Sequence, residues 1–583
     1  SLVGSEMCIR DRNKGKSELF ESENTYAMRM LHNSMVDTNG KAQLPQGGRF
    51  SQTEVESKRY TVRNQIDFDK TWKDHAVTAI AGLEFRENKI PTPARQLLYG
   101  YDPQTLTSDF MNWQAYRDGV GTSALSDRTI TLSGLSATLH ESRHRYASFY
   151  ANAGYSYLSR YNLSGSIRWD QADLFGLDIR NQRHPLWSVG ASWILSEESF
   201  MKEISWLDYL KLRMTYGING NVDQASTTYF VVKKKTQSNP IKTTYLTYED
   251  DDLPNPKLRW EKTATYNIGL DFRLFKNLIS GTLEYYNRHS SDLLVRRYMD
   301  PTLGAGSRVV NNGEMRNRGV ELSLSANIIR KKDWNFAVDF NFDHNKNKML
   351  KVDHSESDNA SLFIKSPLNY FMEGTSYNTL WAYRIDRMEN GYPVAVDKDG
   401  NDLVKFNEDG TVASITSGSS LKGTDDLVNL GSLTPKFSGS VGLRFNYKNF
   451  DLNIYFYGEA GRKRGASYYE GWTRMDNGIN VSTYALKAFS SNNLTATDPT
   501  YVRGGNGWGD YYVKSIYYVR CGSITLGYKV PISQKIVNNL RVYVDVNNPF
   551  VITNWTGLDP ETDNGTYAYP NVTSYNFGVS ISF

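Results

Sequence analysis

The residues that could do chemistry are scattered along the chain instead of forming a known catalytic or metal-binding motif. The eight histidines include no H-E-x-x-H pair and no metal-ligand spacing. His140 and His144 are four residues apart, but no helical pattern surrounds them, so we interpret both as polar loop residues. Two cysteines, Cys8 and Cys521, provide neither a disulfide framework nor a zinc site. The sequence therefore predicts no enzyme and no cofactor.

Two further segments match ligand-binding motifs only in part. The glycine-rich run 504–509 (GGNGWG) lacks the Lys-Ser/Thr pair of a phosphate-binding loop, so it is interpreted as loop backbone. Asp397, Asp399 and Asn401 supply oxygens with calcium-loop spacing, but glycine stands at position 4 of this segment instead of position 6. Two Asp-Gly turns that close hairpins are the favoured interpretation, and a calcium site at these three residues is the alternative.

Apolar and polar residues alternate strictly along 264–274, which predicts a β-strand with two different faces. The apolar positions are Ala264, Tyr266, Ile268, Leu270, Phe272 and Leu274. About eleven residues of this kind cross a bilayer when the strand is tilted. After a short turn at 275–277, the alternation resumes through Ile279, Leu283 and Tyr285.

Similar stretches recur between residues 62 and 583, and their connections alternate between short turns and loops of tens of residues. The short turns are 70–74, 159–160, 275–277, 330–333 and 448–449. Short turns at one rim and long loops at the other are typical of an outer-membrane β-barrel. In such a barrel some carboxylates would solvate the wall of a water-filled lumen: Asp271, Glu284, Glu321 and Asp339.

The apolar residues of the alternating stretches are expected to face lipid, because they share one parity along each strand. This lipid-facing set includes Tyr266, Ile268, Leu270, Val320, Leu322, Leu324, Phe336, Val338 and Phe340.

Composition agrees with a barrel and excludes two other classes of protein. Mean hydropathy is −0.55 and no run of 18 apolar residues occurs in the 583, which excludes a transmembrane helix. Aromatic residues make up 13%, including 39 tyrosines, which suits strands and the aromatic girdles at membrane interfaces. The net charge of +4 comes from dispersed residues, so no nucleic-acid surface is expected.

The two ends of the chain lead to different expectations. The last stretch alternates up to the final residue and is interpreted as the assembly signal of a barrel: Tyr575, Phe577, Val579, Ile581 and Phe583. Residues 1–12 (SLVGSEMCIRDR) resemble a translated adapter scar, which would leave 13–59 as a residual strand and loop segment and 60–583 as the barrel. If the last strand runs towards the periplasm, counting back makes 60–69 run that way too, so we expect the chain to be truncated at its front.

Several stretches resemble the barrel of SusC/RagA-type TonB-dependent outer-membrane transporters. The matches include LRWEKTATYNIGLDF (258–272), RNRGVELSLSANII (316–329), TPKFSGSVGLRFNYKNFDL (434–452) and LRVYVDVNNPFVITNWTGLDPE (540–561). The resemblance implies an all-β fold, a transmembrane antiparallel β-barrel of which this chain would hold about 15–16 of roughly 22 strands. The plug domain and TonB box of that family have no counterpart in this sequence.

The same resemblance implies TonB-dependent import of a large solute, with an oligosaccharide as first candidate and an oligopeptide as second. The implied location is the bacterial outer membrane, and the implied partners are a SusD-like lipoprotein lid, the TonB–ExbB–ExbD complex acting through a plug, the barrel assembly machinery and outer-membrane lipid. A passive porin or structural barrel and a siderophore- or cobalamin-type receptor are the alternatives. A hydrolase would need a rim cluster of catalytic residues that the sequence does not reveal.

Aromatic residues in the long loops are the candidates for contact with substrate or lid, because their rings can stack on sugars and on peptide side chains. These candidates are Trp113, Tyr116, Tyr468, Tyr469, Trp472, Trp508, Tyr511, Tyr512, Tyr567 and Tyr569.

Overall fold

The computed structural model describes most of the chain. That part is residues 2–91, 93–125, 128–132, 141–173, 185–221, 233–236, 244–247, 255, 257–298, 302, 307–352, 360–365, 370, 372–389, 392–416, 421, 423–465, 513–532, 537–555, 559–562 and 570–582.

The chain divides into two compact units according to its internal contacts. Unit 1 consists of Ser1–Asp69, Ala79–Ala151 and Arg168–Leu174. Unit 2 consists of Lys70–Thr78, Asn152–Ile167 and Phe175–Phe583. Both units are built mainly from antiparallel strands.

Unit 1 is built on the pairing of β1 (Leu2–Glu21) with β2 (Gly48–Trp72), in which Leu2 lies opposite Phe68 and Glu21 opposite Arg49. The start of β2 also pairs with β4 (Ala94–Tyr101). The other strands that enter this unit are β3 (His75–Ile90), β5 (Ser142–Tyr157) and β6 (Tyr161–Ala172). Residues 2–12 thus belong to a paired strand, and their proposed origin as a scar stays a prediction.

A small apolar core lies beside these strands and includes two helices. Helix α1 (Tyr26–Ser34) begins after Thr25, whose hydroxyl accepts a hydrogen bond from the Met28 amide at 3.3 Å. Helix α2 (Trp113–Asp118) is capped in the same way by Asn112. The buried members of this core are Met28, Met35, Leu44, Tyr99, Met111 and Ile130.

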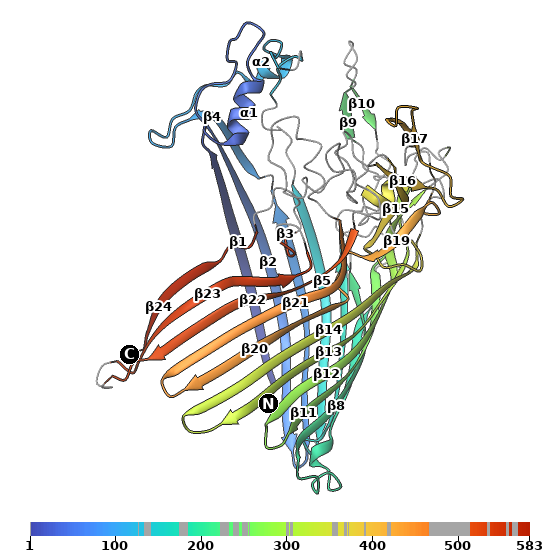
Figure 1. Ribbon diagram of the computed structural model, residues 1–583. Coiled ribbons are helices and arrows are strands. Elements are labelled where there is room, and N and C mark those ends of the chain that lie inside the picture. The colour runs from blue at the N-terminus through green and yellow to red at the C-terminus, as the bar shows by residue number, and fades with distance from the viewer. Residues whose placement is uncertain are drawn as a thin grey trace. The chain divides into compact units, whose positions relative to one another are not determined.

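Unit 2 contains a long antiparallel sheet in which strands adjacent in the chain lie side by side, as the green-to-red strands of Figure 1 show. Further short strands are inserted between β8 and β11 and between β14 and β20. The strands are β7 (Leu186–Ile194), β8 (Leu207–Asn221), β11 (Glu261–Leu274), β12 (Ile279–Tyr298), β13 (Ser307–Arg330), β14 (Trp334–Lys351), β20 (Phe437–Tyr447), β21 (Phe450–Gly465), β22 (Val513–Lys529), β23 (Asn539–Thr553) and β24 (Ser574–Ser582).

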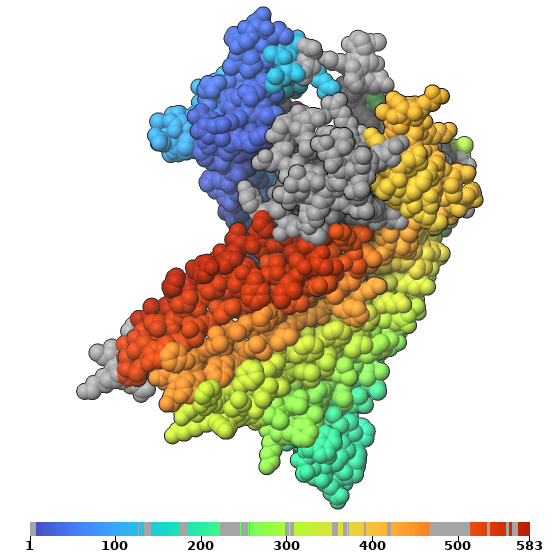
Figure 2. All heavy atoms as spheres, in the orientation of Figure 1, coloured from blue at the N-terminus to red at the C-terminus, as the bar shows by residue number. Residues whose placement is uncertain are grey.

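The register of this sheet separates an apolar face from a polar face, as the alternation predicts. Leu322 lies opposite Leu283 on one side and Phe342 on the other, so the apolar residues form continuous rows. On the other face, Ser323 donates a hydrogen bond to Asn341 at 2.6 Å, and Asn341 donates to Ser440 at 3.1 Å. We call the face that carries Leu322 the apolar face, and the face that carries Ser323 the polar wall. Figure 2 shows the atoms of β13, β14 and β20 to β24 forming one continuous surface.

The predicted short turns are present, and most of them contain residues in the left-handed backbone region. Phe275, Lys276 and Asn277 have φ between 56° and 59°, which is unfavourable for residues other than glycine. Hydrogen bonds to neighbouring connections hold this turn, including one from the Phe275 amide to the Trp206 carbonyl at 2.7 Å. The turns at Ser159 and Lys448 also have positive φ.

The long connections contain small structures of their own. Helix α4 (Ala360–Lys365) packs on β15 (Thr379–Glu389), which pairs with β16 (Tyr392–Val396) and β19 (Leu427–Ser432). The remaining short elements are η1 (Leu195–Glu197), β9 (Lys233–Thr236), β10 (Thr244–Thr247), β17 (Val404–Phe406) and β18 (Val412–Ile415). Within the described residues, no helix combines the length and the apolarity that crossing a membrane requires.

Candidate functional site

A cavity of about 670 Å³ lies on the polar wall of unit 2. Strands β12, β13, β14, β20, β21 and β22 contribute to it because their polar-wall positions all point to the same side. Its carboxylates are Glu284, Glu321, Asp343, Glu459 and Glu561. Its aromatic residues with hydroxyl groups are Tyr455, Tyr457 and Tyr518. Such a lining offers hydrogen-bond acceptors and rings to a ligand rich in hydroxyl or amino groups.

A second hollow of about 530 Å³ continues this cavity towards the short turns. The two hollows share Thr282, Ser323 and Asn341, so they form one polar stripe along the wall. Tyr209 and Arg273 line the second hollow, and the Arg273 guanidinium lies over the Tyr209 ring at 4.7 Å. The described residues include no group of three His, Cys, Asp or Glu side chains arranged to hold a metal ion.

Arginines on the polar wall neutralise several of the carboxylates that the sequence placed in a lumen. Arg213 of β8 donates to Asp271 at 2.8 and 3.0 Å and to Glu284 at 2.6 Å. Arg444 of β20 pairs with Asp339 at 2.7 Å. Because these groups are partly exposed and already paired, they serve as charged wall residues, in agreement with the interpretation that they solvate the wall.

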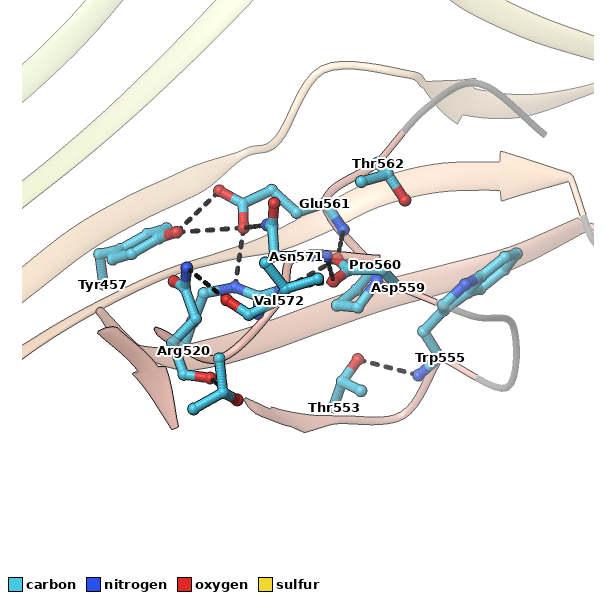
Figure 3. Close-up of polar contacts among 12 residues, drawn as sticks. Tyr457, Arg520, Thr553, Trp555, Asp559, Pro560, Glu561, Thr562, Asn571 and Val572 are labelled. Carbon is cyan, nitrogen blue, oxygen red and sulfur yellow. Dashed lines mark hydrogen bonds and ion pairs between the residues drawn. The ribbon is translucent and has the colours of Figure 1, made fainter. Parts of the chain in front are cut away.

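A buried ion-pair cluster, drawn in Figure 3, lies beside the cavity and contributes Glu561 to its lining. Arg520 of β22 donates to both carboxylate oxygens of Asp559, at 2.7 and 2.9 Å, and to Glu561 at 2.8 Å. The side chains of Arg520 and Asp559 are only 3% and 4% exposed. Tyr457 donates to Glu561 at 3.0 Å, which connects the cluster to the cavity lining. We call Arg520, Asp559 and Glu561 the clamp.

A side chain of strand β21 also binds the backbone of residues 559–562, which carry two members of the clamp. Arg464 donates to the carbonyls of Asp559 at 3.1 Å and Pro560 at 2.8 Å, and also to the carbonyl of Thr562. Its guanidinium lies over the ring of Trp555 at 4.5 Å. The described part of the β23–β24 connection is therefore fastened to β21 and β22. Asp559 and Glu561 belong to the family-like stretch 540–561, but no sequence pattern indicates their pairing with Arg520, which is about forty positions away.

Hydrogen bonding controls the ionisation of Asp559. Burial by itself raises the pKa of this carboxyl, but hydrogen bonds from the Glu561 and Asn571 amides, together with Arg520, outweigh burial and lower it. A lowered pKa in the folded protein contributes stability that is complete above the ordinary aspartate pKa of about 3.9 and is lost as the pH falls below it.

We therefore expect the segment after β23 to detach from the wall in acid. Protease cleavage within 554–573 of the full-length protein should rise as the pH is lowered from about 6 to about 3, with most of the change below about 4. The D559N variant should show more cleavage at neutral pH and a weaker dependence on pH. Equal pH profiles for the wild type and D559N would contradict this assignment.

The structure places only some of the sequence-predicted site residues. Trp113 and Tyr116 pack against the core of unit 1, where Trp113 meets Tyr99 edge to face at 6.0 Å and Tyr116 donates to the Gln43 carbonyl. Their proposed contact with substrate or lid stays a prediction. The other aromatic candidates lie outside the described residues: Tyr468, Tyr469, Trp472, Trp508, Tyr511, Tyr512, Tyr567 and Tyr569.

The predicted terminal strand is β24, on which the apolar residues share one face. Tyr575, Phe577, Val579 and Ile581 are between 50% and 80% exposed, and Phe583 lies outside the described residues. Strand β24 pairs with β23, with Phe577 opposite Val544. The alternation is confirmed, and the role as an assembly signal stays a prediction.

The calcium candidate forms an ordinary turn. The Asp397 carboxylate accepts hydrogen bonds from the amides of Asp399 at 2.9 Å and Asn401 at 2.8 Å, and from the Asn401 side chain at 3.0 Å. These bonds, that of the Asn401 side chain foremost, lower the pKa of Asp397. Gly400 and Gly410 have φ of 85° and 80°, and the second turn joins β17 to β18. Both Asp-Gly turns are therefore formed.

Comparison with known proteins places this architecture in a family. The family profile described as "TonB dependent receptor-like, beta-barrel" matches residues 16–549. The TonB-dependent receptor SusC of Bacteroides thetaiotaomicron is 30% identical over 76% of this chain and 44% of its own length. The TonB-dependent receptor P26 of Formosa agariphila is 26% identical over 93% of this chain and 55% of its own. The chain spans about half the length of these curated relatives.

A solved structure shows the same fold. The structure described as the RagAB peptide transporter superposes with a TM-score of 0.75 at 22% identity and covers 100% of this chain and 60% of that one. The resemblance to the SusC/RagA type is thus confirmed by both sequence and fold. The chain belongs to the TonB dependent receptor-like β-barrel family of bacterial outer-membrane proteins.

Proposed function

We propose that this chain acts as the barrel wall of an importer that moves a large solute across the outer membrane with energy delivered by TonB. The observation that carries the proposal is the polar stripe, whose cavity of about 670 Å³ lies on the polar wall of a TonB-dependent receptor fold. The family to which the chain belongs consists of receptors and transporters, which supports transport over catalysis.

The proposed substrate is an oligosaccharide. Sugar hydroxyls are hydrogen-bond donors, and the carboxylates of the cavity are acceptors in reach of the same space. The rings of Tyr455 and Tyr457 stand 5.9 Å apart and offer flat apolar surfaces of the kind that pack on sugar rings.

An oligopeptide is the second candidate, supported by a different observation. Of the five carboxylates that line the cavity, Glu321 and Asp343 have no ion pair within the described part of the chain, and they would attract a peptide amino terminus or basic side chains. The structurally similar RagAB is described as a peptide transporter, although the likeness to it extends to the fold alone.

The proposed partners follow from the family. A SusD-like lipoprotein would cover the long-loop end, where the aromatic loop candidates would meet substrate or lid, and TonB–ExbB–ExbD would act through a plug. The barrel assembly machinery would recognise β24, whose exposed apolar residues suit that role.

Uptake in cells tests the proposal. Loss of the gene or of TonB should abolish uptake of a labelled neutral oligosaccharide, and the full-length gene should restore it. The double variant E321Q/D343N should reduce uptake of a labelled basic peptide more than that of the sugar, because it removes two cavity charges without removing volume. Uptake that continues without TonB would instead indicate a passive porin, and uptake of peptides alone would select the second candidate.

A further inference from the structure

Four cations lie together on β13 and β14, and we call them the basic patch: Arg316, Arg318, Lys346 and Lys348. The register places Arg318 directly opposite Lys346 and Arg316 directly opposite Lys348. Like charges in directly opposite positions of an antiparallel pair repel each other and destabilise the sheet. The arrangement therefore costs free energy in the isolated chain and indicates an anion that offsets it.

The basic patch lies on the apolar face. On β13, Arg316 and Arg318 precede Val320 and Leu322 at steps of two residues, so all four side chains point to the same side of the sheet. On β14, Lys346 and Lys348 follow Phe340 and Phe342 in the same way, through His344. The patch is consequently the continuation of the lipid-facing rows towards the long-loop end.

Tyrosines mark the boundary between the apolar rows and the basic patch. Tyr285 of β12 lies opposite Val320, and Tyr266 lies on the next strand, β11. The ring centres of the two tyrosines are 6.1 Å apart. Asn287, which lies opposite Arg318, donates to the Tyr266 hydroxyl at 3.0 Å. Tyrosines at such a boundary are typical of the level at which lipid headgroups begin.

Carboxylates do not neutralise the basic patch within the described part of the chain, where none of its four cations has an ion pair. On the same strands, Glu321 and Asp343 point to the polar wall and line the cavity. Glu314 shares the side of the patch, two residues from Arg316, and its carboxylate lies 3.4 Å from the His289 ring without an ion pair to the patch. By contrast, Arg213 and Arg444 of the polar wall are paired with carboxylates.

We infer that the basic patch binds the phosphate groups of phosphorylated lipid headgroups in the outer leaflet. Guanidinium groups bind phosphate through paired hydrogen bonds, and the lysines add point charges. The adjoining rows of Leu322 and Phe342 would hold the acyl chains of the same lipid. A free phosphate would use only the polar half of this surface, whereas a lipid uses both halves. The inference depends on family membership and orientation, and it is independent of the imported solute.

Titration of the detergent-solubilised full-length protein tests this inference. The probes are diphosphorylated lipid A, the same lipid without phosphates, and inorganic phosphate, and bound lipid is counted by native mass spectrometry. The variant R316Q/R318Q/K346Q/K348Q should bind diphosphorylated lipid A about tenfold more weakly or worse. The matched control K276Q/K331Q/K332Q/K448Q removes four exposed cations at the short-turn end and should bind as the wild type does.

Two further measurements keep the test decisive. In lipid-free detergent the patch variant should unfold at the same temperature as the wild type or higher, because it loses like-charge repulsion, so weaker lipid binding would not reflect misfolding. The pair variant R318Q/K346Q should show an intermediate affinity. Equal binding of lipid A by wild type and patch variant, or equal binding of the lipid without phosphates, would overturn the inference. Binding of inorganic phosphate as tight as that of lipid A would overturn it too.

Discussion

Replacing Arg520 by methionine is expected to destabilise the long-loop end of the sheet by about 3–5 kcal/mol. The reason is that Asp559 would remain buried, at 4% side-chain exposure, without the cation that holds both of its oxygens. Glu561 would lose its cationic partner at the same time and keep hydrogen bonds from Tyr457 and Asn571. The measurement is equilibrium unfolding of the full-length protein, together with protease cleavage within 554–573.

The matched control is the methionine variant of Arg541, which pairs with Asp451 at 2.6 and 2.9 Å on the same sheet. The side chains of that pair are 24% and 16% exposed, so water can replace part of the lost interaction. The R541M substitution should lower the free energy of unfolding by about 1 kcal/mol or less. The double variant R520M/D559N should recover part of the loss caused by R520M alone. If R520M and R541M lowered the free energy of unfolding equally, the clamp would not hold its segment more firmly than an exposed ion pair does.

Replacing Leu322 by arginine is expected to lower the free energy of unfolding by about 2–4 kcal/mol, provided that this position lies near the middle of the bilayer. Leu322 sits on the apolar face between Leu283 and Phe342, so the new charge would enter hydrocarbon with no partner. Equilibrium unfolding from lipid vesicles measures the cost.

Arginine at the next residue provides the control for this prediction. Ser323 lines both hollows of the polar wall and lies opposite Thr282 and Asn341. A guanidinium there would reach water and the carboxylates of the cavity. The free energy of unfolding of S323R should therefore lie within about 0.5 kcal/mol of the wild-type value. If L322R and S323R were equally destabilising, the assignment of the two faces would be wrong.

Local pattern in the sequence determined most of the sheet. The alternation along 264–274 predicted β11 (Glu261–Leu274), and the turn at 275–277 is present in the structure. Register follows from such a hairpin because a slip of one residue would place every apolar side chain on the polar wall. Residues 13–59 were expected only as a strand and loop segment, and the bounds of β1 and of the first half of β2 were not predicted, since residues 2–21 and 48–59 show little alternation and form strands by pairing with each other.

Only the tertiary structure decided which distant residues meet. Trp113 and Tyr116 carry no sequence signal that separates ligand contact from packing, and Met28 and Leu44, which share their apolar cluster, come from other segments. Arg520 carries no sequence signal of its own, and only the folded chain brings Asp559 and Glu561 against it. The two like-charged pairs of the basic patch likewise exist only through the pairing of β13 with β14. The physical reason is the same each time: side-chain alternation is set by neighbours along the chain, whereas burial and ion pairing depend on residues that only folding brings within a few ångströms.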